Sequence, residues 1–193
     1  LDSWEGEHWV SLVGFRFLNL AVKGVPAIGH RDFPEINLRF YVRREVAGEV
    51  RRGVVFLREL TPRRIVEWMA RAVYNEPYST LPMCARVEES KTAYELELDG
   101  NTQRMAVTST GGWHEPEAME EFFIEHYWGY NRQTDGGAME YEVTHPKWRT
   151  RPAELARFDL DVETLYGPEW ISTLMRKPDS VVLADGSEVV VLS

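Results

Sequence analysis

Residues 33–42, Phe33-Pro34-Glu35-Ile36-Asn37-Leu38-Arg39-Phe40-Tyr41-Val42, decide the fold class that this sequence predicts. From Glu35 onward, apolar and polar side chains alternate at period two, which is typical of a half-buried β-strand. One face carries Ile36, Leu38, Phe40 and Val42, and the other carries Glu35, Asn37, Arg39 and Tyr41. The stretch therefore predicts a strand with one apolar face in the core.

Further strand-like runs surround this stretch. Residues 53–60 form a second strand, and Val46-Ala47-Gly48-Glu49 makes the two a candidate hairpin. Other strands are expected at residues 82–88, 92–98, 103–108, 138–145 and 153–160, with a turn at Asp99-Gly100-Asn101. Asp185-Gly186 lies between two valine-rich runs and predicts a C-terminal hairpin.

Helical signals are few. A helix is expected to begin at Thr61-Pro62 and to end at Asn75, because Thr is a good N-cap and Pro suits the first helical position. Two more are expected over residues 116–128 and 168–175. Many short strands with few helices favour a sandwich or barrel over a doubly wound parallel sheet. With no linker visible, residues 1–193 are expected to form a single domain.

Composition excludes several classes of partner. A net charge of −9 argues against nucleic acid, since such proteins need basic surface to displace counterions from phosphate. No apolar run approaches the ~20 residues of a membrane span, so no membrane partner is expected. Cys84 is the only cysteine, so no internal disulfide can form, and we expect a cytoplasmic protein. Cys84 itself is expected to be a small core residue, because free cysteine is usually buried.

The polar face of the first strand is the first candidate site. Glu35 beside Arg39, or beside Arg58 on the partner strand, could act as an acid or base or position a substrate carboxylate. The alternative is a solvated outer face with cross-strand ion pairs, which periodicity alone favours. No two of the five histidines show zinc-ligand spacing, so no metal site and no cofactor are expected.

Several stretches together resemble a known family. The strand at residues 33–42, the Trp-Val run near 9–17, the strand at 53–56, Tyr74-Asn75-Glu76-Pro77-Tyr78 and His145-Pro146-Lys147-Trp148 occur in the order typical of the YqjF-like family. That family belongs to the acetoacetate decarboxylase-like superfamily and is largely uncharacterised. The resemblance implies a mainly β fold, an antiparallel β-barrel with two or three flanking helices and a central cavity. Similar proteins also carry a segment before Leu1, so an N-terminal segment is expected to be missing.

The resemblance also bears on chemistry. In acetoacetate decarboxylase a lysine forms a Schiff base with the keto acid, whereas Tyr78 or Ser79 stands at the matching position here. Schiff-base decarboxylation is therefore not expected. Glu35 matches a glutamate of the related enzyme's pocket strand, which makes a cavity-facing Glu35 as strong an expectation as the solvated face.

The combined hypothesis is a barrel cavity that binds a small anionic or carbonyl-containing metabolite. Glu35 would be the catalytic base or anchor, Tyr78 would donate a hydrogen bond, and Arg39 or Arg58 would pair with an anionic group. Tyr41 and Trp148, together with Phe40 and Trp68, are candidate walls, although each could belong to a plain core. The alternatives are ligand binding without catalysis, and a scaffold or homo-oligomer that pairs through the valine-rich C-terminal segment.

Overall fold

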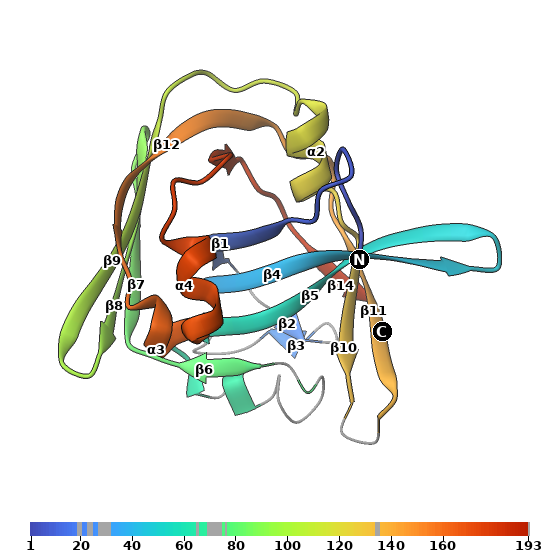
Figure 1. Ribbon diagram of the computed structural model, residues 1–193, viewed down its shortest axis with the longest axis horizontal. Helices are drawn as coiled ribbons and strands as arrows, with labels where there is room; N and C mark the ends of the chain where they lie inside the picture. The colour runs from blue at the N-terminus through green and yellow to red at the C-terminus, as the bar shows by residue number, and fades with distance from the viewer. Residues whose placement is uncertain are drawn as a thin grey trace.

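The computed structural model describes residues 1–18, 21–22, 25–26, 32–64, 66–68, 75, 77–133 and 136–192; for 21–22, 25–26 and 191–192 it describes the backbone alone. Most described residues lie in strands of two curled sheets that form a half-barrel (Figure 1). Helices flank these sheets. The mainly β, largely antiparallel fold predicted from the sequence is therefore confirmed.

The larger sheet has the strand order β1-β4-β5-β10-β11-β14, and β6 also pairs with β5. Its strands are β1 (Val10–Phe17), β4 (Phe33–Val46), β5 (Glu49–Thr61), β6 (Tyr78–Thr80), β10 (Trp128–Arg132), β11 (Ala138–Thr144) and β14 (Val190–Leu192). Pairing is antiparallel except that β10 and β6 run parallel to β5. Strand β4, which contains the stretch at residues 33–42, lies between β1 and β5, so both of its edges are hydrogen-bonded over most of that stretch.

The smaller sheet has the strand order β13-β12-β9-β8-β7. Its strands are β7 (Met83–Val87), β8 (Lys91–Leu98), β9 (Asn101–Ser109), β12 (Thr150–Asp159) and β13 (Val182–Ala184); a separate short pair is β2 (Ala21–Val22) with β3 (Val25–Pro26). Asp99 and Gly100 have φ values of 48° and 78° between β8 and β9. Two consecutive positive φ angles are what a tight hairpin turn requires, and the predicted turn is confirmed.

The described helices are short: α2 (Ala118–Ile124), α3 (Val162–Tyr166), α4 (Ile171–Leu174) and the 3₁₀ turn η1 (Pro168–Trp170). The second predicted helix, residues 116–128, was too long, because the observed helix ends at Ile124 and Trp128 already begins β10, which pairs with β5 and β11. Of the helix predicted after Thr61, residues 64 and 66–68 are helical and most of the remainder lies outside the described residues. None of the helices in the described part of the chain has the length and apolar composition needed to cross a membrane.

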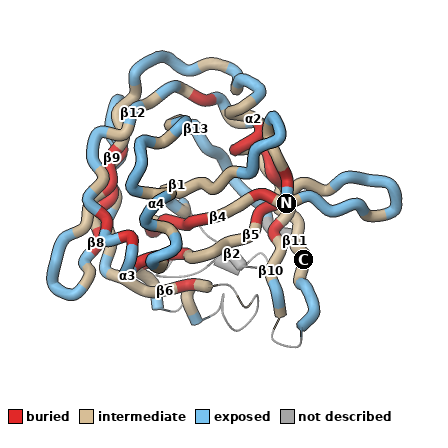
Figure 2. The backbone as a smooth tube through the Cα atoms, viewed as in Figure 1, coloured by how far each residue is buried: buried red, intermediate tan, exposed pale blue. Residues whose placement is uncertain are grey.

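Two cores hold the fold together. The first fills the space between the sheets and joins the apolar face of β4, at Ile36 and Leu38, to Leu96 on β8 and Leu165 on α3. The second lies under α2, where Tyr41, Val54, Phe122 and Phe123 are buried together. Buried segments accordingly run along β4 and β5 and reappear on β8 and β9 (Figure 2).

Two sequence predictions were wrong in instructive ways. Asp185-Gly186 does not close a hairpin, because β13 pairs with β12 in one sheet and β14 pairs with β11 in the other. The turn signal was real, since Gly186 has a φ of 70°, but it redirects the chain from one sheet to the other. Cys84 is exposed instead of buried, because it points to the outer face of β7.

Candidate functional site

Both faces of β4 are buried. On the polar face Glu35 is 1% exposed and Asn37 is 2% exposed. The solvated-face alternative is therefore wrong. The register then brings further polar residues to this face, because Asn37 pairs with Glu59 on β5 and Glu59 pairs with Tyr78 on β6. Glu59 is 2% exposed and Thr61, two residues further along β5, is fully buried.

Glu35 and Tyr78 are in direct contact. The Tyr78 hydroxyl donates a hydrogen bond of 2.9 Å to Glu35 Oε2, and both side chains are buried. A hydrogen bond of this kind compensates the buried Glu35 carboxyl group for the hydration that it loses. The arrangement places a proton donor against a carboxylate in a site largely closed to water.

The Glu59 carboxylate is a second acidic group on this face; it follows Arg58 on the strand expected to pair with residues 33–42, and no role was predicted for it. Thr61 was interpreted from the sequence as a helix N-cap, and the structure places it at the end of β5. The sequence does contain a sign of this group, because Glu59 is an acidic residue within the otherwise largely apolar run Gly53–Leu60. The structure adds that Glu59 pairs with Asn37. Two buried glutamates thus lie on neighbouring strands of one face.

Arg39 and Tyr41 share the face but lie at its other end. The Arg39 Nη2 donates to the Phe123 carbonyl at 3.1 Å, and its guanidinium lies 5.8 Å from the centre of the Tyr41 ring. The Tyr41 hydroxyl is 2.6 Å from Ser11 Oγ. Four residues of strand separate Arg39 from Glu35, or about 13 Å. Both side chains therefore anchor α2 and do not contact Glu35.

Arg58 and Trp148 lie elsewhere. Arg58 pairs with Leu38, which places it on the opposite face of the sheet from Glu35, and its Nη1 donates to Ser79 Oγ at 3.0 Å. Trp148, between β11 and β12, stacks on His145 at 3.9 Å and donates to Ser187 Oγ at 2.7 Å. Of the other two candidate walls, Trp68 is 69% exposed, and Phe40 belongs to the opposite face of β4 from Glu35.

His126, beneath α2, is the most perturbed imidazole of the described residues. Burial, then the nearby Arg52 and Arg39 guanidiniums, lower the pKa of His126 to about 3. Its Nε2 lies 3.9 Å from Asp2 Oδ2, while Asp2 is also paired with Arg52 at 2.9 Å. No group of three or more His, Cys, Asp or Glu side chains in the described ranges is arranged to hold a metal ion.

Schiff-base chemistry would need a lysine, so the positions of the lysines matter. Lys91 lies at the start of β8 and is exposed, and Lys147 Nζ is paired with Glu121 at 2.8 Å. Lys23 lies outside the described residues. Tyr78, which with Ser79 was predicted from the family resemblance to stand where the related decarboxylase has its lysine, donates a hydrogen bond to Glu35.

Comparison with known proteins shows which family the chain matches. The family model of DUF2071, described as an uncharacterized conserved protein, matches residues 1–188. The uncharacterized protein YqjF of Bacillus subtilis (strain 168) is 34% identical over 164 residues, which are 80% of this chain and 64% of that protein. The chain thus spans less than two thirds of this relative's length.

Solved structures show the fold. A crystal structure of acetoacetate decarboxylase from Legionella pneumophila superposes with a TM-score of 0.56 at 14% identity, covering 91% of this chain and 68% of that one. The enduracididine biosynthesis enzyme MppR gives a TM-score of 0.44 at 14% identity over 70% of this chain and 55% of its own. The resemblance to the acetoacetate decarboxylase-like fold is confirmed by the first of these.

Proposed function

The chain belongs to the DUF2071 family of uncharacterized conserved proteins, and from this premise we propose that it binds a small carbonyl-containing metabolite at the buried face formed by Glu35, Glu59 and Tyr78. The observation that carries the proposal is the 2.9 Å hydrogen bond between Tyr78 and the buried Glu35. Buried ionisable groups that bond to one another in the interior of a ligand-binding fold are more often functional than surface charges are.

Acid–base chemistry is the reaction class that these groups support. Glu35 would remove a proton from the carbon next to the ligand carbonyl, and the Tyr78 hydroxyl, turned from Glu35 to the bound ligand, would donate its one hydrogen bond to the carbonyl oxygen as negative charge develops there. Tyr78 and Ser79 occupy the positions where the family resemblance implies a lysine, so the proposed chemistry does not include a Schiff base formed there. Because Arg39 and Arg58 are bonded elsewhere, a neutral carbonyl group suits the face better than a ligand held by an arginine.

The test is a thermal-shift screen of keto acids, lactones, aldehydes and short carboxylates. A ligand at 100 times its Kd adds about 2.7 kcal/mol of stability, which raises the Tm of a domain this size by roughly 5–10 °C. Compounds that stabilise the wild type should lose this effect in Glu35→Gln. The matched control is Glu97→Gln, whose exposed carboxylate bonds to Thr102 on the smaller sheet and should leave the shift intact.

Catalysis and simple binding are then separated by hydrogen exchange. A stabilising compound is incubated in D₂O, and exchange at the carbon next to its carbonyl is followed by NMR. Exchange faster than in buffer, and lost in Glu35→Gln, would support acid–base catalysis, whereas binding without exchange would identify a non-catalytic ligand-binding protein. If no compound in the panel stabilises the wild type, the proposed ligand class is wrong. A cytoplasmic location, suggested by the single cysteine, belongs to the same proposal.

A scaffold role is the second candidate, and the edge of the larger sheet favours it. Strand β14 is the last strand of that sheet, and Val189 and Val190 are 42% and 46% exposed. Exposed apolar edge strands pair readily with another chain. Light scattering should then show a homo-oligomer that Val190→Lys dissociates, and a monomer at all concentrations would contradict it.

A further inference from the structure

The outer face of the smaller sheet has a hollow, because two small residues lie in the middle of a row of side chains that crosses four strands. The register places Arg86, Ala93, Ala106 and Arg157 side by side across β7, β8, β9 and β12. Alanine is uncommon in strands, and exposed rows of antiparallel sheets usually carry longer side chains that pair across strands. Here the two alanine methyl groups form a low floor, and Ala106 is only 5% exposed although it points away from the core.

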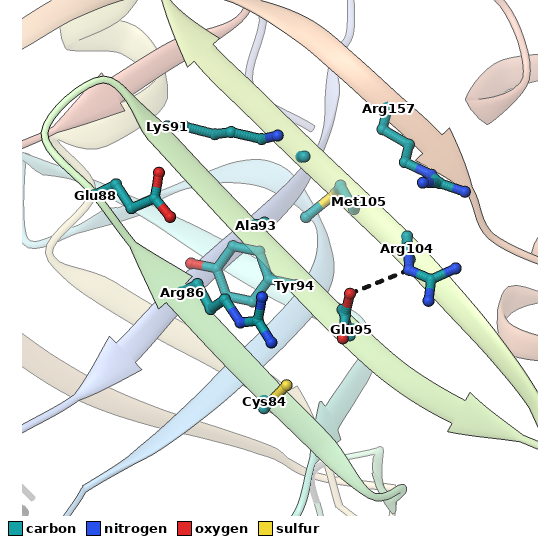
Figure 3. Close-up of a pocket in the computed structure, with 11 residues that line it drawn as sticks. Cys84, Arg86, Glu88, Lys91, Ala93, Tyr94, Glu95, Arg104, Met105 and Arg157 are labelled. Atoms are coloured by element: carbon teal, nitrogen blue, oxygen red, sulfur yellow. Dashed lines mark hydrogen bonds and ion pairs between the residues drawn. The ribbon is translucent and has the colours of Figure 1, made fainter.

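Cations surround this floor. Arg86 stands at one end of the row and Arg157 at the other, while Lys91 and Arg104 stand above and below it (Figure 3). Two glutamates, Glu88 and Glu95, complete the rim, so the lining carries four cations and two carboxylates. A net positive hollow contrasts with the chain's formal net charge of −9.

The partners of these cations differ. Arg104 is paired with Glu95 at 3.1 Å, as the dashed line in Figure 3 shows, and Arg157 is paired with Asp159 on its own strand. Arg86 and Lys91, in contrast, make no ion pair with any residue that the structure describes. These two side chains are therefore available to an incoming anion.

The dimensions set the class of occupant. The hollow has a volume of about 200 Å³, below the roughly 300–1,000 Å³ typical of sites for drug-sized ligands. Three inter-strand spacings separate the backbones of Arg86 and Arg157, or about 14 Å. We propose that this hollow binds a small organic carboxylate, with the apolar body on the floor of Ala93 and Ala106 and the carboxylate against Arg86 and Lys91. This site is separate from the Glu35 face and does not depend on the function proposed there.

The adjacent Cys84 offers a direct measurement. It is the only cysteine of the chain, it is exposed, and it lies on the same face of β7 as Arg86. The rate at which Cys84 reacts with the neutral reagent 4,4′-dithiodipyridine is measured at increasing concentrations of 2-naphthoate. Acetate serves as an anion without an apolar body, and 2-naphthylmethanol serves as an apolar body without the anion.

We expect 2-naphthoate to slow the reaction with a saturable dependence, and acetate and 2-naphthylmethanol to have much weaker effects at equal concentration. Arg86→Gln should weaken the protection about two- to fivefold, as loss of one exposed ion pair implies. Arg176→Gln, which removes an exposed arginine that is paired with Asp179 and does not line the hollow, should not change it.

Other outcomes would overturn the proposal. Equal protection by acetate would mean that the alanine floor plays no part and that only diffuse surface charge is sensed. Linear, non-saturating protection, or protection unchanged in Arg86→Gln, would exclude a defined site. Unchanged circular dichroism and Tm of Arg86→Gln would show that its effect is local.

Discussion

The Tyr78 hydroxyl on β6 bonds to Glu35 Oε2 on β4 by reaching across β5, which lies between the two strands. The residues are 43 positions apart in sequence, so only the sheet register brings them together. Tyr78→Phe removes the hydroxyl and leaves the buried carboxylate with one donor fewer. We expect the free energy of unfolding to fall by about 1–3 kcal/mol, measured by urea unfolding at pH 7.

The control for this substitution is Tyr94→Phe. Tyr94 is also buried, but its hydroxyl makes no hydrogen bond with a side chain among the described residues, so stability should be little changed or increased. Equal losses in the two variants would show that removing a buried hydroxyl, and not the bond to Glu35, accounts for the cost.

A close backbone approach joins β5 to β10. A Cβ built at Gly53 would lie 2.5 Å from the Trp128 carbonyl oxygen, which is backbone and cannot rotate away. Gly53→Ala must therefore separate the parallel strands, and we expect a loss of about 1–3 kcal/mol in the free energy of unfolding. Gly112→Ala is the control, because a Cβ there meets nothing within 4 Å. A wild-type Tm in Gly53→Ala would show that the β5–β10 pairing tolerates this separation.

The sequence was most informative where structure is local. Alternation in residues 33–42 predicted β4 and the composition of both its faces, and Ala47-Gly48 and Asp99-Gly100 predicted tight turns that are present. It failed at β10, because Trp128 continues a helical pattern and only its distant partners, Gly53 on β5 and Glu142 on β11, make it a strand. It failed at β13 and β14 for the same reason, since a turn signal does not specify which sheet each flank joins.

The candidate site shows the same division. Glu35 was predicted from the polar face of its strand and from the family resemblance, Tyr78 was predicted from the resemblance alone, and the structure joins them in one hydrogen bond. Arg58 was predicted because it lies on the strand expected to pair with residues 33–42, but it pairs with Leu38, and adjacent residues of a strand point to opposite faces. Trp148 was predicted as a wall because it is large and aromatic, whereas its position depends on the connection between β11 and β12, which no local pattern reveals.

Thr150 fixes α2 to the smaller sheet. Its fully buried hydroxyl donates to Glu120 Oε2 at 2.8 Å, and the same oxygen accepts from the Glu117 backbone N–H. Burial alone would raise the pKa of Glu120, but these bonds, together with His114, whose Nε2 lies 2.9 Å from the same oxygen, outweigh it and hold the pKa below its usual value. Glu120 therefore contributes stability that is present above its unfolded pKa of about 4.3 and is lost as the pH falls below it.

Thr150→Val removes one of these donors. We expect a loss of about 1–2 kcal/mol in the free energy of unfolding at pH 7, and a smaller difference from wild type at pH 3, where Glu120 becomes protonated. Thr102→Val, which removes the hydroxyl that donates to the Glu97 carboxylate on an exposed pair, should stay within about 0.5 kcal/mol of wild type. A Thr150→Val defect that is the same at both pH values would mean that lost packing, not the carboxylate, is responsible.

His126 should control stability in mild acid. Its side chain is 2% exposed, its ring packs 4.7 Å from that of Tyr41, and neither ring nitrogen accepts or donates a hydrogen bond among the described residues. The folded-state pKa of about 3 is far below the unfolded value of about 6.5. Below pH 6.5 the unfolded chain binds a proton that the folded protein excludes, so the free energy of unfolding falls by about 1.4 kcal/mol per pH unit until the pH approaches 3.

His126→Phe removes this linkage while keeping a ring against Tyr41. We expect stability at pH 7 to be unchanged or higher, and the slope of unfolding free energy between pH 6 and pH 4 to be shallower than in wild type by about 1 kcal/mol per unit. The facing charges Asp2, Arg52 and Arg39 remain in both proteins, so their contribution cancels in the comparison. His145→Phe, which replaces a half-buried imidazole stacked on Trp148, serves as the control for exchanging an imidazole for a phenyl ring elsewhere in the chain. An unchanged slope in His126→Phe would mean that the imidazole is protonated inside the folded protein, with Asp2 at 3.9 Å as its counter-ion.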